Sequence, residues 1–151
     1  MTKKIVIFPH TIFKNEEDLR NWLAGSLKLK HEGKYPLTST KGLGQLEEGS
    51  IVFFHINSHI VGMAVVEEGL RPIKKEEIVN YDEFKKIMEL SKMEFSNIIK
   101  FFPNSIWAFS NEEFIPREEV GKILNKDIHQ NYTNIDTLDD LLKILALIKY
   151  K

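Results

Sequence analysis

The chain has no cysteine among its 151 residues. This absence excludes a disulfide framework, a thiolate zinc site and a cysteine nucleophile. It suits a reducing compartment, so we expect a cytoplasmic protein. Long apolar runs are missing too: none reaches the ~18 residues that a membrane span requires, and the N-terminal run is too short for a signal peptide. The sequence therefore predicts a protein with no membrane partner.

An excess of charge of one sign is also absent. The formal net charge is −1, from 21 basic and 22 acidic residues. A protein that binds nucleic acid mainly through the phosphates is usually basic, so any nucleic-acid surface here must be local. Apolar residues make up 42% of the chain, which is ordinary for a globular protein. From the length we expect residues 1–151 to form a single domain.

Apolar runs predict the elements of a mixed α and β domain. Residues 50–56 and 59–67 are two such runs joined by Asn57-Ser58, which predicts a β-hairpin. Both runs are apolar at successive positions, so both faces should be covered. Residues 31–46 are expected to form a polar loop. Further strands are expected at 4–9, 98–102 and 105–109, and helices from Asn15, around Phe84, from Pro116 and from Thr137.

The predicted hairpin carries a family resemblance. Residues 46–55 (LEEGSIVFFH) and 60–66 (IVGMAVV) resemble the PUA-like superfamily, especially its EVE and ASCH branches. Gly49 and Gly62 hold the two glycine positions of that pattern, whereas His55 comes one residue earlier than the EVE histidine. The resemblance implies an α/β (α+β) fold: a small twisted β-barrel of about five or six strands with flanking helices.

The polar loop and two strands supply candidate site residues. A loop of this length is often functional. Tyr35 could stack on a flat ring; stacking a base is worth ~1–3 kcal/mol and tolerates any base, so polar groups must make the choice. We predict a ligand pocket with aromatic walls, hydroxyl and imidazole groups for the edge of a base, and one cation, lined by Tyr35, Ser39, Lys41, His55 and Trp107. The competing expectation is that Trp107 fills the barrel interior.

Three functions stay open. The favoured one is a nucleic-acid-binding module, not an enzyme, that accommodates a single and possibly modified base in DNA or RNA. The second is a small amidohydrolase of modified nucleosides, as some ASCH-like domains suggest, using Thr38 or Thr40, Lys41 and Glu67. Here Lys41 follows Thr40, which reverses the order in that family. The third is a non-catalytic protein-interaction domain.

No cofactor and no metal are predicted. The histidines show neither the i, i+4 helical pair nor the deaminase pattern that would mark a metal site. A site without cysteine would have to gather its ligands from scattered loops. The five histidines are His10, His31, His55, His59 and His129.

Overall fold

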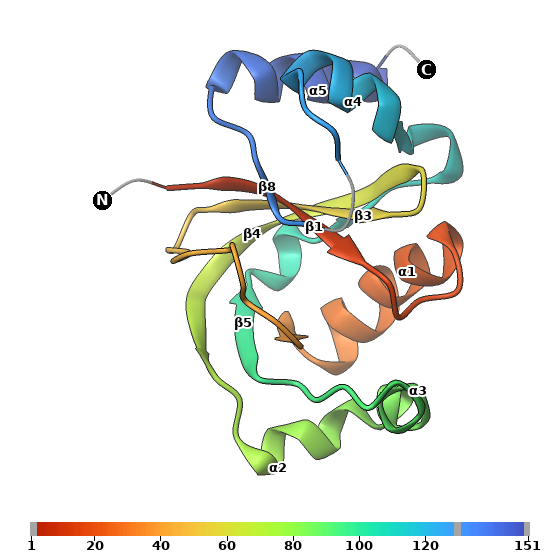
Figure 1. The fold of residues 1–151 in the computed structure, drawn as a ribbon, viewed down its shortest axis with the longest axis vertical. Coiled ribbons are helices and arrows are strands. Elements are labelled where there is room, and N and C mark those ends of the chain that lie inside the picture. Colours follow the sequence, from red (N-terminus) through yellow and green to blue (C-terminus); the bar gives the residue numbers. More distant parts are fainter. Residues whose placement is uncertain (1–2, 129–130, 150–151) are drawn as a thin grey trace.

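A strongly bent, open β-sheet organises the chain (Figure 1). The computed structural model describes residues 3–128 and 131–149, and within them eight strands follow the order β2-β5-β4-β3-β1-β8, with β6 and β7 both paired to β4. The strands are β1 (Ile5–His10), β2 (Lys34–Leu37), β3 (Ile51–Ile56), β4 (His59–Pro72), β5 (Asn97–Phe101), β6 (Trp107–Ala108), β7 (Ile115–Pro116) and β8 (Thr133–Asn134).

Helices lie on both sides of this sheet. In Figure 1, α4 and α5 cover one face of β1, β3 and β4, and α1 lies on the opposite face together with β5. The helices and helical turns are α1 (Glu16–Trp22), η1 (Leu23–Lys30), α2 (Lys75–Ile78), η2 (Val79–Phe84), α3 (Lys85–Ser91), η3 (Pro103–Ser105), η4 (Asn111–Glu113), α4 (Arg117–Leu124) and α5 (Leu138–Lys149). None of the helices in the described ranges is both long and apolar enough to cross a membrane.

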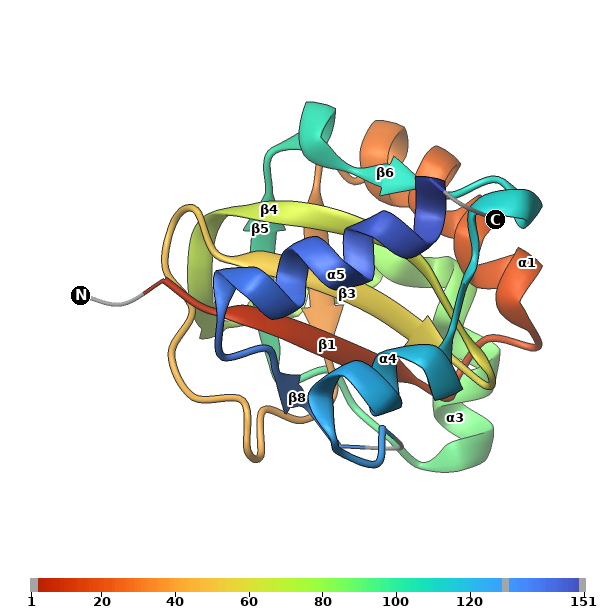
Figure 2. The same cartoon turned by 90° about the horizontal axis from the view of Figure 1, so that it is seen from above.

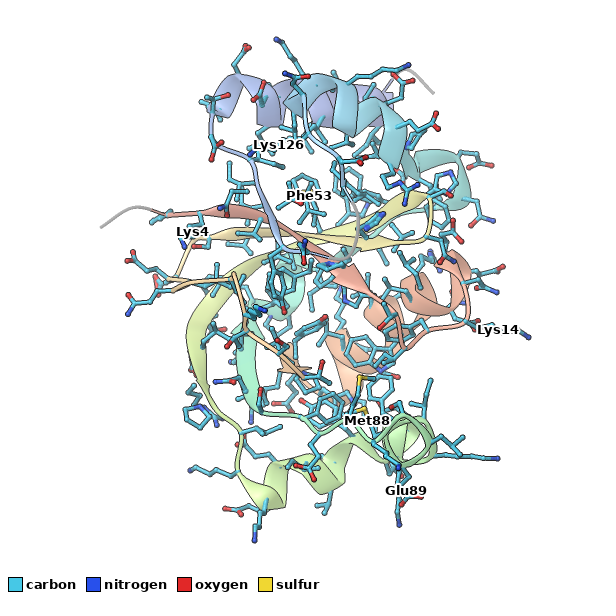
Figure 3. All side chains as sticks on the ribbon, in the orientation of Figure 1. Lys4, Lys14, Phe53, Met88, Glu89 and Lys126 are labelled. Atoms are coloured by element: carbon cyan, nitrogen blue, oxygen red, sulfur yellow. The ribbon has the colours of Figure 1, made fainter. Side chains whose placement is uncertain are left out.

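The predicted hairpin is confirmed. β3 and β4 pair antiparallel around Asn57-Ser58, with Phe53 opposite Met63 and an irregularity between Phe54 and His55. β1 lies beside β3 in parallel, so β3 is a central strand and is buried on both faces. Figure 3 shows Phe53 between the sheet and the layer of α4 and α5, and the next residue, Phe54, contacts the rings on the other face.

The expected closed barrel is wrong, because the two edges of the sheet do not pair. β4 is 14 residues long and bends: its first part pairs with β3 and its last part with β5, with register shifts on both sides of Glu68. The bend brings the β2 edge toward the β8 edge. Among the described residues, a side-chain hydrogen bond from the Tyr132 hydroxyl to the Ser39 carbonyl, at 2.6 Å, links the two edges there, and no strand pairing does. The sheet therefore curls without closing.

Two local expectations also need correction. The loop expected at 31–46 contains β2, which pairs with β5 from Lys34 opposite Lys100 to Leu37 opposite Asn97. Pro36 concealed this strand in the sequence, yet β2 is an edge strand, where a residue without an N–H is tolerated. The strand expected at 105–109 is reduced to β6, because the turn η3 extends to Ser105.

The first helix forms as its sequence predicts. The Asn15 side chain accepts a hydrogen bond from the backbone N–H of Asp18 at 2.9 Å, which caps α1. Leu23 is fully buried and packs on Gly62 of β4: a Cβ added to that glycine would lie 2.9 Å from Leu23 Cδ1 and 2.7 Å from the Trp107 carbonyl oxygen. The glycine thus permits the close approach of helix, β4 and β6.

We predict that Leu23→Ala lowers the free energy of unfolding by about 2–5 kcal/mol, because it removes a fully buried side chain from this contact. Leu29→Ala is the matched control, since Leu29 lies in the same helix and is 73% exposed; it should cost less than about 0.5 kcal/mol. Urea denaturation measures both. Equal losses in the two variants would contradict the packing described here.

Candidate functional site

Tyr35 is a core residue of β2 rather than a loop residue, with only 8% of its surface exposed. Its ring contacts Phe8, Phe54 and Phe101 at centroid distances of 5.9, 5.8 and 5.8 Å. Burial raises the pKa of the Tyr35 phenol well above its ordinary value, so the hydroxyl keeps its proton. Tyr35 can therefore act both as a hydrogen-bond donor and as an acceptor.

His10, at the end of β1, is the partner of that hydroxyl. Its Nδ1 lies 3.1 Å from the backbone oxygen of His55, and its Nε2 is hydrogen-bonded to the Tyr35 hydroxyl. A carbonyl only accepts, so Nδ1 carries the ring proton. Burial lowers the pKa of His10 to about 4 and thereby keeps the ring neutral. Nε2 is then the acceptor, and Tyr35 donates to it.

Three more aromatic rings join this pair. Trp22 lies 6.0 Å from Tyr35 and 5.3 Å from Phe84, and Phe13 lies 5.5 Å from Phe84 and 6.0 Å from His10. We call His10, Phe13, Trp22, Tyr35 and Phe84 the Tyr35 cluster. His10 and Phe13 are half-buried and the other three are buried, so the cluster reaches the surface at these two residues.

Ser39 and Lys41 lie in the exposed loop that follows β2. The loop is fastened by the Tyr132 hydroxyl, which donates to the Ser39 carbonyl, and the Ser39 hydroxyl accepts from the Lys41 N–H at 3.3 Å. The ring of Tyr132 lies 5.1 Å from Phe8, which in turn contacts Tyr35. One ring therefore separates the fastening point of the loop from Tyr35.

The remaining two predicted residues lie in different surroundings. His55 is buried, and its Nε2 donates to the Asn57 carbonyl at 3.0 Å, which closes the hairpin end. Trp107 is 41% exposed on β6 and packs edge-on against Phe109 at 4.8 Å, so it does not fill the interior. Figure 2 shows β6 on the opposite side of the molecule from the loop between β2 and β3.

The structure thus connects Tyr35 through His10 to the backbone of His55 but not to its imidazole, connects Ser39 to Tyr35 through Tyr132 and Phe8, and separates Trp107 from them. A ligand-binding role for any of the five stays a prediction. Sequence reasoning missed His10 as the central partner. The available signal was its position directly after an apolar strand, where a polar side chain is presented at the end of a sheet.

The residues of the hydrolase hypothesis are not assembled. Glu67 forms an ion pair with Lys100 at 3.1 Å, and Lys41 is exposed. Within the described ranges, no hydrogen bond or ion pair joins Glu67 to Lys41, Thr38 or Thr40. A threonine nucleophile needs a base within hydrogen-bonding reach, and this arrangement provides none.

Metal ligands do not converge in the part of the chain that the structure describes, which leaves out His129: no three histidine, aspartate or glutamate side chains lie together there. His59 instead contacts Glu16 at 2.8 Å, and His31 contacts Glu83 at 2.7 Å. These contacts account for two of the histidines by hydrogen bonds within the fold.

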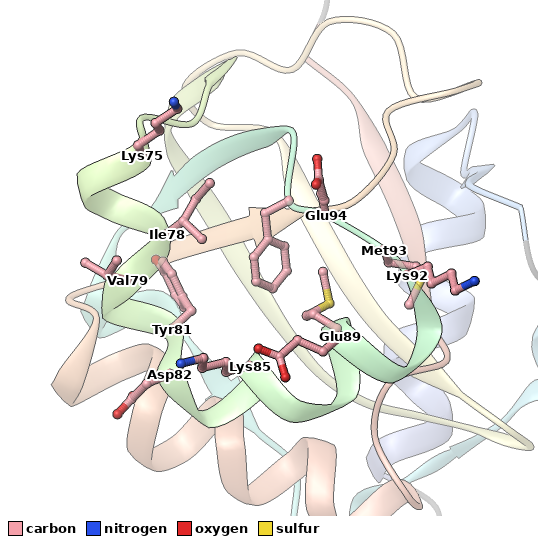
Figure 4. A pocket seen from close by; sticks show the side chains of 12 residues that line it. Lys75, Ile78, Val79, Tyr81, Asp82, Lys85, Glu89, Lys92, Met93 and Glu94 are labelled. Atoms are coloured by element: carbon pink, nitrogen blue, oxygen red, sulfur yellow. The ribbon is translucent and has the colours of Figure 1, made fainter.

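A groove of about 760 Å³ opens beside the Tyr35 cluster (Figure 4). It lies between the α2–η2–α3 segment and the chain that leads into β5, and Tyr81, Met88, Met93 and Phe95 line its floor. Its size is within the range of small-molecule pockets. The sequence around it reads as charged, with an apolar stripe typical of a core-facing helix, so the groove could not be foreseen.

No family model matches the sequence, and no curated protein is significantly similar to it. Among solved structures, the fold is similar to that of the YTH domain of the Zygosaccharomyces rouxii MRB1 protein in complex with N6-methyladenosine RNA. The TM-score is 0.54, with 12% sequence identity over 98% of this chain and 88% of that chain. The similarity concerns the fold alone.

We predict that His10 makes stability depend on pH between about 4 and 6.5. Folding lowers its pKa from 6.5 to about 4. Within this window the unfolded chain therefore binds more protons, and stability falls as the pH falls, by at most about 1.4 kcal/mol per pH unit. Above pH 6.5 the His10 ring is neutral in both the folded and the unfolded chain, so it no longer changes the stability. Urea denaturation across this range should show a smaller slope for His10→Gln than for the unaltered protein, and equal slopes would contradict the assignment.

Proposed function

We propose that this protein is an EVE-type nucleic-acid-binding module that holds a single modified base at the Tyr35 cluster. The observation that carries the proposal is the neutral pair of Tyr35 and His10 enclosed by aromatic rings. Aromatic walls with a few polar groups are what a base extruded from its stack requires. The similarity in fold to a domain solved with N6-methyladenosine RNA adds support and makes RNA the first ligand to test.

The chemistry of the pair suits a neutral base. The Tyr35 hydroxyl uses its proton on His10, so its oxygen keeps a lone pair that can accept from an exocyclic N–H of a base. A methyl group on that nitrogen would pack against Phe13 or Trp22, whose rings flank the pair. Recognition would thus combine one hydrogen bond with apolar contact, in a site that carries no charge.

Entry of a base requires one ring to move, because the rings of the cluster are in contact. Phe13 is the ring that can turn aside most easily, since it is half-buried and lies in the segment between β1 and α1. Trp22 is held more firmly, by a hydrogen bond from its Nε1 to Glu83 at 3.0 Å. We therefore propose that Phe13 covers the site and that Trp22 forms its fixed wall.

We predict that Tyr35→Phe weakens binding of the modified RNA by about three- to tenfold, because it removes one hydrogen bond and keeps the ring. Fluorescence anisotropy with short single-stranded RNAs, with and without one central N6-methyladenosine, measures the affinities. Phe13→Ala should change the affinity for the modified RNA as well. Trp107→Ala is the comparison on the other side of the molecule. A loss of binding in Trp107→Ala alone would place the base site elsewhere and contradict the proposal.

We also predict that Lys41→Ala weakens RNA binding and flattens its salt dependence by about one unit of slope, if Lys41 contacts one phosphate. Lys41 is exposed and forms no salt bridge with a described residue. Lys122→Ala is the control, since Lys122 is exposed on α4 and pairs with Glu119. Equal salt slopes for the two variants would show that Lys41 contacts no phosphate.

A further inference from the structure

We propose that the groove beside α2, η2 and α3 binds an aromatic ring that carries a negative charge, which is the chemistry of a nucleotide. The inference deepens the proposed function, on which it rests in one respect: a nucleotide in the groove would be a neighbour of the base held at the Tyr35 cluster. The case has four parts, namely the floor of the groove, the charge along its edge, its rigidity and its continuity with the cluster.

The floor is apolar and adaptable. Tyr81 and Phe95 contribute two rings whose centroids are 5.9 Å apart, and Met88 and Met93 contribute flexible thioethers. Figure 3 shows Met88 directed from α3 toward the core, while Glu89, the next residue, is directed outward. Methionine side chains adapt to the shape of a bound group and make favourable contacts with aromatic rings. This floor suits the face of a flat ring.

The edge of the groove formed by α2, η2 and the start of α3 favours an anion. Figure 4 shows Lys75 and Lys85 on this edge, with Ile78 and Val79 between them. Neither lysine forms an ion pair with a described residue. The acid on the same edge, Asp82, pairs with Lys30 at 3.1 Å, and Lys30 also contacts Glu83 at 3.4 Å. A ligand whose ring lies on the floor can therefore place its charge between two uncompensated lysines.

The remaining rim charges do not cancel this preference. Lys92 lies on the far side of the groove, together with Glu94, and Glu89 lies on α3 (Figure 4). Three lysines and three carboxylates line the opening, and Lys30 contacts Asp82 and Glu83 from outside it. The lining therefore has no net charge, and selection of an anionic ring depends on the position of its charge beside Lys75 and Lys85, which suffices for a modest preference but not for strong binding of an anion alone.

The groove is held open by contacts of its own walls. The Tyr81 hydroxyl donates to the Lys34 carbonyl at 2.6 Å, and the Tyr81 ring stacks on His31 at 4.2 Å. Glu77 accepts two hydrogen bonds from Arg71, at 2.7 and 2.6 Å, which ties α2 to β4. A wall anchored in this way does not have to be ordered by the ligand, so its entropy is not lost on binding.

The groove also continues into the Tyr35 cluster. Phe95 lies 6.0 Å from Phe84, Phe84 lies 5.3 Å from Trp22, and Trp22 lies 6.0 Å from Tyr35. Phe84 is therefore shared: one side of it supports the groove and the other supports the cluster. Adjacent nucleotides of one strand could occupy the two sites on either side of this ring.

The methionines make the groove directly observable. In protein labelled with ¹³C at the methionine methyl groups, adenosine 5′-monophosphate should shift the Met88 and Met93 signals, which belong to the groove, and leave Met63, on β4, unchanged. Adenosine should shift the same signals at lower affinity, and inorganic phosphate should shift none. No shift with the nucleotide, or an equal shift of Met63, would overturn the proposal.

Two pairs of variants locate the contacts. Lys85→Glu should weaken binding of the nucleotide about fivefold and leave adenosine unchanged, whereas Lys86→Glu, its neighbour outside the groove, should change neither. Val79→Asp should weaken both ligands about tenfold. Its control is Leu90→Asp: the two side chains are 71% and 75% exposed, and only Val79 lines the groove. Equal effects within either pair would overturn the assignment of the groove.

A final comparison shows whether the nucleotide comes from a strand or is free, and it tests the base site independently of the groove. If the natural ligand is part of a strand, the trinucleotide ApApA should bind more tightly than the mononucleotide, and Tyr35→Phe should reduce that advantage. If the ligand is a free nucleotide, the two should bind equally and Tyr35→Phe should have no effect. Both results support the groove. If the nucleotide still shifts the methionine signals but RNA binding does not depend on Tyr35 or Phe13, the base site is contradicted and the groove is not.

Discussion

The double pairing of β4 is the constraint on which the rest of the structure depends. Its first part pairs with β3 and its last part with β5, so one strand belongs to both halves of the sheet. Because β2 pairs with β5, the bend of β4 carries β2 back over the end of β1. Tyr35 and His10, 25 positions apart in the sequence, meet there. Without the bend, neither the pair nor the rings around it would assemble.

A neutral polar pair inside an aromatic cluster is costly to bury unless it is fully hydrogen-bonded. Here the two nitrogens of His10 are both occupied, one by the His55 carbonyl and the other by the Tyr35 hydroxyl. Burial lowers the pKa of His10 to about 4, so no charge arises near neutral pH. The same contacts that satisfy the pair leave one lone pair on the Tyr35 oxygen. The hydrogen bonds that make burial of the pair possible therefore also leave it able to bind a ligand.

The sequence predicts what is local and fails where distant segments meet. The hairpin and the cap at Asn15 follow from neighbouring residues, and both are confirmed. Whether the barrel closes depends on the meeting of β2 and β8, which no local pattern encodes. Tyr35 lies in a buried strand and not in the expected loop, because Pro36 concealed that strand in the sequence. Its partner His10 could not be identified without the parallel pairing of β1 and β3.

The groove was hidden for a different reason. Met88 and Phe95 are apolar residues that a sequence assigns to a core, and they are indeed mostly buried. A groove floor and a core wall differ only in whether another segment covers them. Here Phe95 contacts Phe84 in the core and also lines the open groove. Residue type alone cannot distinguish these two cases.

The charge balance can be reconciled with a nucleic-acid ligand once the ion pairs are counted. Several basic side chains form ion pairs within the fold, among them Lys30, Arg71 and Lys100. The lysines beside the loop and the groove, Lys41, Lys75 and Lys85, have no such partner among the described residues. A near-zero net charge therefore coexists with local cations that are free for a ligand. Because these cations are few, most of the affinity must come from contacts with rings, and binding should depend on salt much less than it does in a protein that grips the phosphate backbone.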